Sequence, residues 1–237
     1  MKHTDETFIE GLGPESYTKW RGSRLGEITE ALEDRLLLDL AGAVTGRHVL
    51  DVGCGDGTLA LTLSRGGAVV TGVDASPAMI QAATDRVKSH GAEILLCVGQ
   101  AERLPIASNS FDLVIAKTVL CFIGDPAPVF EEMVRVLRPG GRLVIGELGR
   151  WSTWAAGRRI RAWLGSRLWR QGRFRTKTEL ERLAENAGLS VHLIRGAVYF
   201  PRWSVAARLL ASLDGFFARH TTLGGAFLAM AATKPLD

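Results

Sequence analysis

From residue 47 onward, short apolar runs rich in β-branched residues alternate with longer stretches of helical periodicity. This order is typical of β-α-β units, in which helices connect the parallel strands of one sheet. The expected strands are residues 48–52, 69–73, 93–98, 111–116 and 142–147, and the expected helices are residues 58–65, 77–90 and 127–137. The alternation therefore predicts a mostly parallel sheet that is covered by helices.

The segments on either side of this region complete the predicted fold. Residues 14–44 have leucines at helical spacing and are expected to form one or two covering helices. A helix is expected over residues 177–187, followed by an antiparallel pair of strands at residues 191–200 and 226–233. The predicted fold class is α/β: a Rossmann-like, doubly wound, mostly parallel sheet with an antiparallel C-terminal strand and helices on both faces.

A length of 237 residues, 46% of them hydrophobic and 23% charged, allows one sizeable core and excludes a disordered chain. We predict a single domain. Its four parts are N-terminal covering helices at 1–46, a core at 47–149, a basic tryptophan-rich insertion at 150–176, and C-terminal helices and final strands at 177–237.

The cysteines and the first residues predict the compartment. Cys54, Cys97 and Cys121 are too few and too scattered for a disulfide scaffold or a four-ligand zinc site. The first ten residues carry charges where a secretory signal needs an apolar stretch, and no window approaches 18 uncharged apolar residues. We therefore expect a soluble, cytoplasmic protein without a transmembrane helix.

The positive charge of the chain is concentrated in one segment. Between Leu148 and Thr178 there are eight arginines, one lysine and no acid, whereas the formal net charge of the whole chain is +4. The rest of the chain therefore carries a net charge of −5. Four of the six tryptophans also lie in this segment, so its composition differs from that of the remainder.

The first expected strand ends in VLDVGCGDG, which places Gly53, Gly55 and Gly57 at a spacing of two. Glycines at this position allow a sharp turn and let a ligand approach the backbone at a helix N-terminus. A plain strand-to-helix turn would give the same pattern. Asp74, which ends the second strand, adds a carboxylate of the kind that accepts hydrogen bonds from ribose hydroxyls.

Acids next to the glycines indicate the charge of the ligand. Asp51 and Asp56 would repel a pyrophosphate seated at the helix N-terminus, but they suit a ligand that carries an ammonium and a sulfonium. The glycine spacing also departs from the GxGxxG of dinucleotide-binding proteins. A positively charged nucleoside ligand is therefore favoured over NAD.

These motifs resemble those of the class I S-adenosylmethionine-dependent methyltransferases, in the small-molecule branch that includes quinone-biosynthesis enzymes. VLDVGCGDGTLA is similar to the first motif of the family and VTGVDASPAMIQAA to the second. GQAERLPIASNSFDLVI resembles the third and fourth motifs, and EEMVRVLRPGGRLVI resembles the stretch before the fifth strand. The motifs occur in the family's order over residues 48–147, so 47–149 would be the cofactor-binding core.

The resemblance implies a set of cofactor-binding residues: Asp51, Gly53, Cys54, Gly55, Asp74, Ala75, Met79, Gln100, Ala101, Glu102 and Lys117. The residues of the first motif would line the methionine part, Asp74 would bind the ribose hydroxyls, and Ala75 and Met79 would border the adenine. Gln100 stands where the family usually has an aspartate that accepts from the adenine amino group, and its amide oxygen can still accept.

The resemblance names no catalytic residue. It places residues 117–122 beside the transferable methyl group, where relatives often have two histidines and this chain has Cys121 and Phe122. We favour packing over a nucleophilic role for Cys121, because no histidine or lysine partner is identifiable. Lys117 is expected to be solvated or to act through its backbone. The five histidines are dispersed, so no metal site is expected.

Several readings of the flanking segments remain open. Tyr17, Trp20 and Arg21 belong either to a helix that folds over the cofactor or to a plain covering helix. Glu147 ends the fifth strand, where it lies near the active site or pairs with an arginine. Residues 150–175 form a lid over the acceptor, an interfacial helix on anionic membrane, an anion-binding segment or a solvated face; nucleic-acid binding is least favoured.

The predicted function is transfer of a methyl group from S-adenosylmethionine to a small, hydrophobic or anionic acceptor. The alternatives are an NAD(P)-dependent oxidoreductase and a non-catalytic protein that binds S-adenosylmethionine. The acceptor, the acceptor atom and the oligomeric state stay open at this point.

Overall fold

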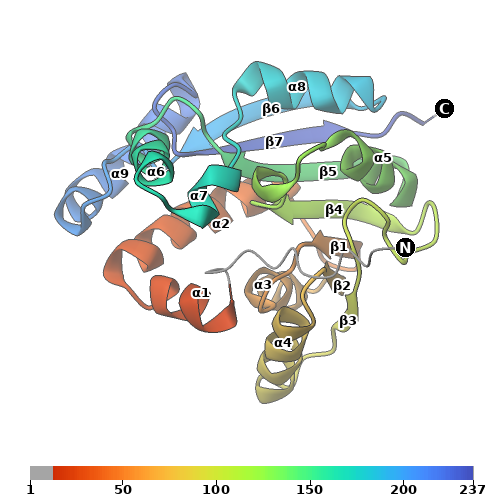
Figure 1. The fold of residues 1–237 in the computed structure, drawn as a ribbon. Helices are drawn as coiled ribbons and strands as arrows, with labels where there is room; N and C mark the ends of the chain where they lie inside the picture. The colour runs from red at the N-terminus through yellow and green to blue at the C-terminus, as the bar shows by residue number, and fades with distance from the viewer. Residues whose placement is uncertain (1–12, 237) are drawn as a thin grey trace, which may run out of the picture.

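The computed structural model of the protein describes residues 13–236, and the sequence expectations for the first ten residues lie outside this range. Seven strands form one sheet (Figure 1): β1 His48–Val52, β2 Val69–Asp74, β3 Leu95–Val98, β4 Phe111–Lys117, β5 Leu137–Leu148, β6 Ser190–Ala197 and β7 Phe227–Thr233. Their order is β3-β2-β1-β4-β5-β7-β6, and β7 runs antiparallel to both neighbours. The predicted fold class is therefore confirmed.

Helices precede and connect these strands. They are α1 Pro14–Arg21, α2 Arg24–Ala41, α3 Thr58–Arg65, α4 Pro77–Ser89, the 3-10 helix η1 Leu120–Phe122, α5 Ala127–Val136, α6 Thr153–Trp163, α7 Arg167–Gln171, α8 Lys177–Asn186 and α9 Ser204–His220. No helix among residues 13–236 is long and apolar enough to cross a bilayer.

The central strands are apolar on both faces because each face packs on helices. Successive residues of a strand point to opposite faces, so Val114 and Ile115 belong to two separate core clusters. The Ile115 cluster includes side chains of α2, α3 and α9, and the Val114 cluster includes side chains of α5 and α8. The near-continuous apolar runs seen in the sequence follow from this double coverage.

Local sequence signals set several helix starts. The Ser76 side chain accepts a hydrogen bond from the Met79 amide (3.2 Å) and Pro77 begins α4, as the sequence indicates. Thr176 caps α8 in a reciprocal capping box with Glu179. These caps satisfy amide groups that would otherwise lack partners at the helix ends.

β5 differs most from its expected bounds. It starts at Leu137 instead of residue 142, because Leu137 pairs with Phe111 ahead of an irregularity in the register. The turn between residues 137 and 142 stays hydrogen-bonded to the segment just after β7, since the Gly140 amide donates to the Lys234 carbonyl (2.9 Å). Gly140 has φ +74°, a conformation that favours glycine. The expected helix-to-strand turn is therefore part of the strand itself.

α9 is the element whose position the sequence did not predict. It buries small side chains, Ala207 among them, while larger apolar side chains such as Leu209 remain exposed. Its large apolar residues lie on the exposed face, so the usual pattern of a helix with its apolar side toward the core does not locate it. The expected antiparallel pair of strands on either side of it, β6 and β7, is present.

Asp214 attaches α9 to the end of β6. Its carboxylate is buried and accepts hydrogen bonds from the amides of Val198 (3.2 Å) and Tyr199 (2.9 Å). Val198 has φ +62°, which is costly for a β-branched residue, so these bonds hold a strained turn. Burial raises the pKa of Asp214, and the hydrogen bonds oppose that rise.

We expect Asp214→Ala to lower the free energy of unfolding by about 3 kcal/mol, because two buried amides lose their acceptor. Asp214→Asn keeps one accepting oxygen and should lose about half as much. Urea denaturation of both variants measures the difference. An Asp214→Ala variant as stable as wild type would show that the carboxylate does not hold this turn.

Candidate functional site

A cavity of about 950 Å³ opens at the carboxyl ends of β1, β2 and β4. The chain continues from β1 to β2 on one side and reaches β4 on the other, so this is the switch point at which open α/β sheets bind ligands. All eleven residues that the sequence proposed for cofactor binding line the cavity: Asp51, Gly53, Cys54, Gly55, Asp74, Ala75, Met79, Gln100, Ala101, Glu102 and Lys117. The strand ends bring together residues that lie up to 66 positions apart.

The glycine loop between β1 and α3 forms one wall. Gly53 (φ +68°) has no room for a side chain, because an added Cβ would collide with Val119. Gly55 (φ +54°) has no atom within 4 Å of an added Cβ. Gly53 therefore allows close packing of two loops, whereas Gly55 leaves its backbone accessible from the cavity.

Asp74 connects the ends of β1 and β2. Its carboxylate accepts hydrogen bonds from the amides of Gly55 and Ser76, both at 2.9 Å. Burial raises the pKa of Asp74, and these two bonds oppose the rise. Each carboxylate oxygen has a second lone pair, so Asp74 can accept further bonds from hydroxyl groups in the cavity.

Asp51 is the most exceptional charge of the site. It is 1% exposed, and its Oδ2 has no hydrogen-bond partner. Burial, with the nearby Asp74 and Asp34 carboxylates, raises the pKa of Asp51 to about 8. A buried carboxylate with a free oxygen on a cavity wall is a binding position for a cation or a hydrogen-bond donor.

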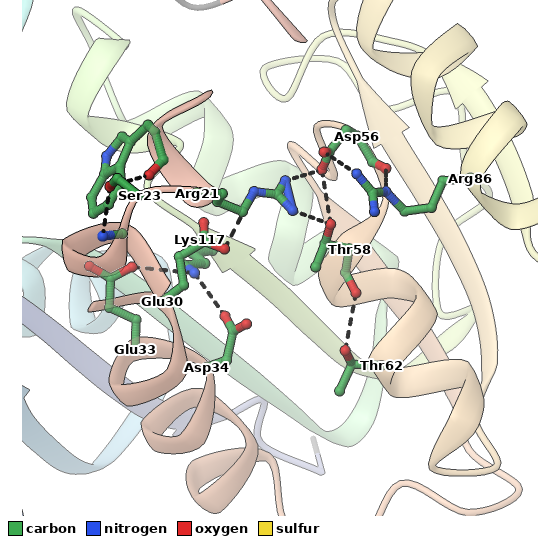
Figure 2. Close-up of polar contacts among 12 residues, drawn as sticks. Arg21, Ser23, Glu30, Glu33, Asp34, Asp56, Thr58, Thr62, Arg86 and Lys117 are labelled. Carbon is green, nitrogen blue, oxygen red and sulfur yellow. Dashed lines mark hydrogen bonds and ion pairs between the residues drawn. The ribbon is translucent and has the colours of Figure 1, made fainter. Parts of the chain in front are cut away.

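Asp56, in contrast, has its charge neutralised within the chain. Arg86 of α4 donates to its carboxylate (Nη2 to Oδ2, 2.7 Å) and to its backbone carbonyl, and Arg21 of α1 pairs with the other carboxylate oxygen (Figure 2). The expectation that Asp56 helps to select a cationic ligand is therefore corrected. Asp51 is the acid of this loop that has a carboxyl oxygen, Oδ2, without a partner in the chain.

Lys117 is also paired, which corrects the expectation that it is solvated. Its Nζ lies 2.7 Å from Asp34 Oδ1 and 3.3 Å from Glu33 Oε2, both on α2 (Figure 2). These carboxylates raise the pKa of Lys117 although burial opposes the rise. Lys117 thus fixes α2 against the end of β4 while its stem lines the cavity.

The two N-terminal helices cover the cavity, and they supply the lining residues that the sequence analysis left undecided or missed. Tyr17 and Arg21 line the cavity, which agrees with the interpretation of α1 as a helix that folds over the cofactor site. Trp20 instead packs on Trp154 of α6. Glu30 and Asp34 also line it and were not predicted. Their spacing of four along α2 puts two acids on one helix face, which is the signal that could have found them.

Apolar residues of the loop after β4 line another part of the cavity. Val119, Phe122 and Ile123 contribute here. Cys121 is fully buried behind them, its thiol donates to the Thr118 carbonyl (3.0 Å), and burial raises the pKa of the thiol. A protonated thiol outside the cavity supports the packing interpretation of Cys121 over a nucleophilic one.

Glu147 supports η1 from below. It is fully buried, and its Oε1 accepts a hydrogen bond from the Leu120 amide (2.7 Å). Burial raises its pKa to about 8. Since Glu147 does not line the cavity, its visible contact is structural: it positions the loop that carries Phe122.

Residues 150–176 lie outside the lining of the cavity. Arg158 of α6 stacks on the rings of Trp154 (5.3 Å) and Trp169 (4.7 Å), and Phe174 packs in the cluster behind Cys121. Among the described residues, no group of three or more His, Cys, Asp or Glu side chains could hold a metal ion.

We expect Asp51→Asn to stabilise the ligand-free protein increasingly as pH rises. With a raised pKa, folded Asp51 keeps a proton that the unfolded chain releases above about pH 4, so wild-type stability falls between pH 4 and 8. The variant should gain about 2 kcal/mol or more at pH 8.5 and at most about 1 kcal/mol at pH 4.5. Urea denaturation at both values measures this, with exposed Asp85→Asn as control. A gain that is independent of pH would contradict the assignment.

Comparisons with known proteins agree with this geometry. A family model described as a methyltransferase domain matches residues 50–145. An uncharacterized protein of Mycobacterium tuberculosis is 33% identical over 222 residues, which cover 94% of this chain and 72% of that protein. The ubiquinone biosynthesis O-methyltransferase of Xanthomonas euvesicatoria is 33% identical over 178 residues, covering 73% of this chain and 72% of the relative.

The fold is likewise shared with a solved structure. A methyltransferase from Thermotoga maritima, described as a possible histamine N-methyltransferase, is similar with a TM-score of 0.70 at 21% identity, covering 93% of this chain and 95% of that one. The family match, the relatives and the fold lead to one conclusion. The chain belongs to the S-adenosylmethionine-dependent methyltransferases.

Proposed function

We propose that this enzyme binds S-adenosylmethionine in the cavity at the ends of β1 and β2 and transfers its methyl group to a small apolar acceptor. The observation that carries the proposal is the buried carboxyl group of Asp51, whose Oδ2 has no hydrogen-bond partner in the chain and could be paired by a cationic ligand. S-adenosylmethionine supplies an ammonium and a sulfonium, and its sulfonium carries an already activated methyl group. The donor set of the cavity therefore fits this cofactor.

The residues of the cavity would divide the cofactor between them. Asp51 would balance the positive charge of the methionine part, with the backbone of Gly53, Cys54 and Gly55 beside it. Asp74, which already holds the loop, would accept from the ribose hydroxyls. The remaining candidates would surround the adenine: Ala75, Met79, Gln100, Ala101 and Glu102.

Electrostatics favour this ligand over NAD. Repulsion between a diphosphate at the glycine loop and Asp51 would keep the Asp51 carboxyl protonated, so the diphosphate would gain no charge pairing there, whereas a cation would pair with the Asp51 carboxylate. Arg21 could not offset that repulsion, since it already pairs with Asp56 and Glu30. An NAD(P)-dependent oxidoreductase is therefore the weaker alternative.

The lining of the cavity favours an apolar acceptor over an anionic one. Arg21 and Lys117, the two cations that line it, are both paired with carboxylates of the chain. Val119, Phe122 and Ile123 offer apolar contacts instead. The Xanthomonas relative is named for ubiquinone biosynthesis, which agrees with an apolar acceptor. Alignment of acceptor and methyl group would supply much of the rate, because no base has been identified.

Cofactor binding should be visible as thermal stabilisation. S-adenosylmethionine or S-adenosylhomocysteine at about 100 times its Kd should add roughly 2.7 kcal/mol of stability, which is several degrees in Tm. Differential scanning fluorimetry with NAD in parallel distinguishes the alternatives. A shift with NAD alone would favour the oxidoreductase. Tight binding of S-adenosylmethionine without labelled methyl transfer to any fraction of a cell extract would favour a non-catalytic binding protein.

A double-mutant-type cycle, which combines an Asp74 variant with a ligand analogue, can separate ribose binding by Asp74 from its structural role in the loop. Asp74→Asn keeps an accepting oxygen for the Gly55 or Ser76 amide, so the fold should persist, whereas Asp74→Ala removes both. We expect Asp74→Asn to weaken S-adenosylhomocysteine binding about tenfold or more. The wild-type protein should also bind the 2′-deoxy analogue of S-adenosylhomocysteine about tenfold more weakly, whereas the affinity of the variant should fall little further with this analogue. Calorimetry measures all four affinities; independent, additive losses would reject the contact.

A further inference from the structure

Large apolar side chains are concentrated on one exposed part of the surface. Among residues 13–236, seventeen large apolar side chains are exposed, and twelve of them lie in α6, α9 or the loops beside them. The most exposed include Trp163 (86%), Trp203 (72%) and Leu209 (70%). We call the exposed side of α6, α9 and their flanking loops the docking face. A patch of this kind on a water-exposed surface indicates a partner.

α6 and α9 belong to one region of the molecule. Figure 1 shows both at the same end of the sheet, beyond β6 and β7. The indole nitrogen of Trp154 on α6 donates to the carbonyl of Phe200 just before α9 (2.8 Å), and the Gly224 amide after α9 donates to the Trp151 carbonyl before α6 (2.9 Å). These bonds connect both ends of α9 to the start of α6.

The orientation of α9 is the reverse of that of an ordinary surface helix. Its buried face consists of small or polar residues, Ala207 and Asp214 among them. Leu209, Leu213 and Phe216 follow one another at spacings of four and three on the exposed face. A helix gains little from burying alanine and leaving leucine and phenylalanine in water, unless the second face is buried elsewhere.

Positive charge surrounds this apolar face. Arg159 and Arg161 on α6 and Arg208 and Arg219 on α9 are exposed. Residues 148–176 contain no acid, and Asp214, the only acid in residues 199–224, is buried beneath α9. The docking face therefore combines apolar and cationic groups without an exposed carboxylate of its own elements.

We propose that the docking face binds the surface of an anionic lipid bilayer, with α9 lying in the plane of the interface. Tryptophan side chains are suited to the headgroup level, leucine and phenylalanine to the acyl boundary, and arginine to anionic headgroups. A second copy of the chain would bring the same arginines against one another in a symmetric interface. Nucleic acid would match the charge but leave the apolar side chains unburied.

This surface differs from the one that the sequence analysis expected. Residues 150–175 contribute Trp163 and the exposed arginines of α6, but Arg158 is stacked between Trp154 and Trp169 and is not available to lipid. α9 supplies the apolar stripe, which the sequence analysis did not identify. The proposal goes beyond the methyl transfer and does not depend on which acceptor is used.

The test is sedimentation of the full chain with vesicles, using phosphatidylcholine alone or mixed equally with phosphatidylglycerol. The variant Leu209→Ser/Leu213→Ser/Phe216→Ser should lower the partition coefficient onto mixed vesicles about a hundredfold, because three inserted side chains lose their apolar contact. Leu95→Ser/Leu236→Ser, which removes exposed apolar side chains elsewhere, is the matched control and should bind like wild type. Circular dichroism confirms that each variant is folded.

The charge component is tested separately. Arg208→Gln/Arg219→Gln should weaken binding to the mixed vesicles about tenfold and leave binding to pure phosphatidylcholine unchanged. Wild-type binding to mixed vesicles should blue-shift the tryptophan fluorescence, and the triple serine variant should lose this shift.

Three results would overturn the proposal. The first is wild-type protein that stays in the supernatant with both vesicle types, and the second is a triple serine variant that sediments with lipid as wild type does. The third is a lipid-free dimer in analytical ultracentrifugation that the triple serine variant converts to a monomer, because the docking face would then be an interface between copies of this chain. Neither result bears on the cofactor, whose binding is measured without lipid.

Discussion

Two carboxylates held together inside the protein, at the ends of β1 and β2, govern the chemistry of this site. Burial and the Asp74 carboxylate raise the pKa of Asp51, and Asp51 has no internal partner for Oδ2. Asp74 is partly compensated by two backbone amides. Burying these two carboxyl groups lowers the stability of the ligand-free protein. A positively charged ligand would offset that loss, which would then contribute to the free energy of binding.

Other charged side chains around the cavity are paired within the chain. Asp56 is neutralised by Arg21 and Arg86, and Lys117 by acids of α2. Because these pairs join α1 to the loop after β1 and α2 to the end of β4, they also position the two helices that cover the cavity (Figure 2). A buried pair adds little net stability, but it fixes which elements lie together.

Sequence reasoning identified the strand ends and the glycine loop because their signals are local. The alternation of strands and helices, Ser76 with Pro77, and the acids beside the glycines are all readable within a few residues. The ion pairs of Asp56 and Lys117 could not be predicted from the sequence, since their partners lie up to 83 positions away. The position of α9 was not predicted for a different reason. Its large apolar residues face outward, which is the opposite of the pattern by which core-facing helices are recognised.

The position of β7 has a consequence for the order in which the chain can assemble. β7 lies between β5 and β6, although β6 precedes it in the chain. Strands β1 to β5 run parallel to one another and need β7 only at the outer edge of β5, so they can form a parallel unit as soon as they have been synthesised. β6 cannot join the sheet until β7 has been synthesised, because β7 pairs with both β5 and β6. During that interval the edge of β5 lacks its permanent neighbour, and it is the backbone most open to pairing with a foreign chain.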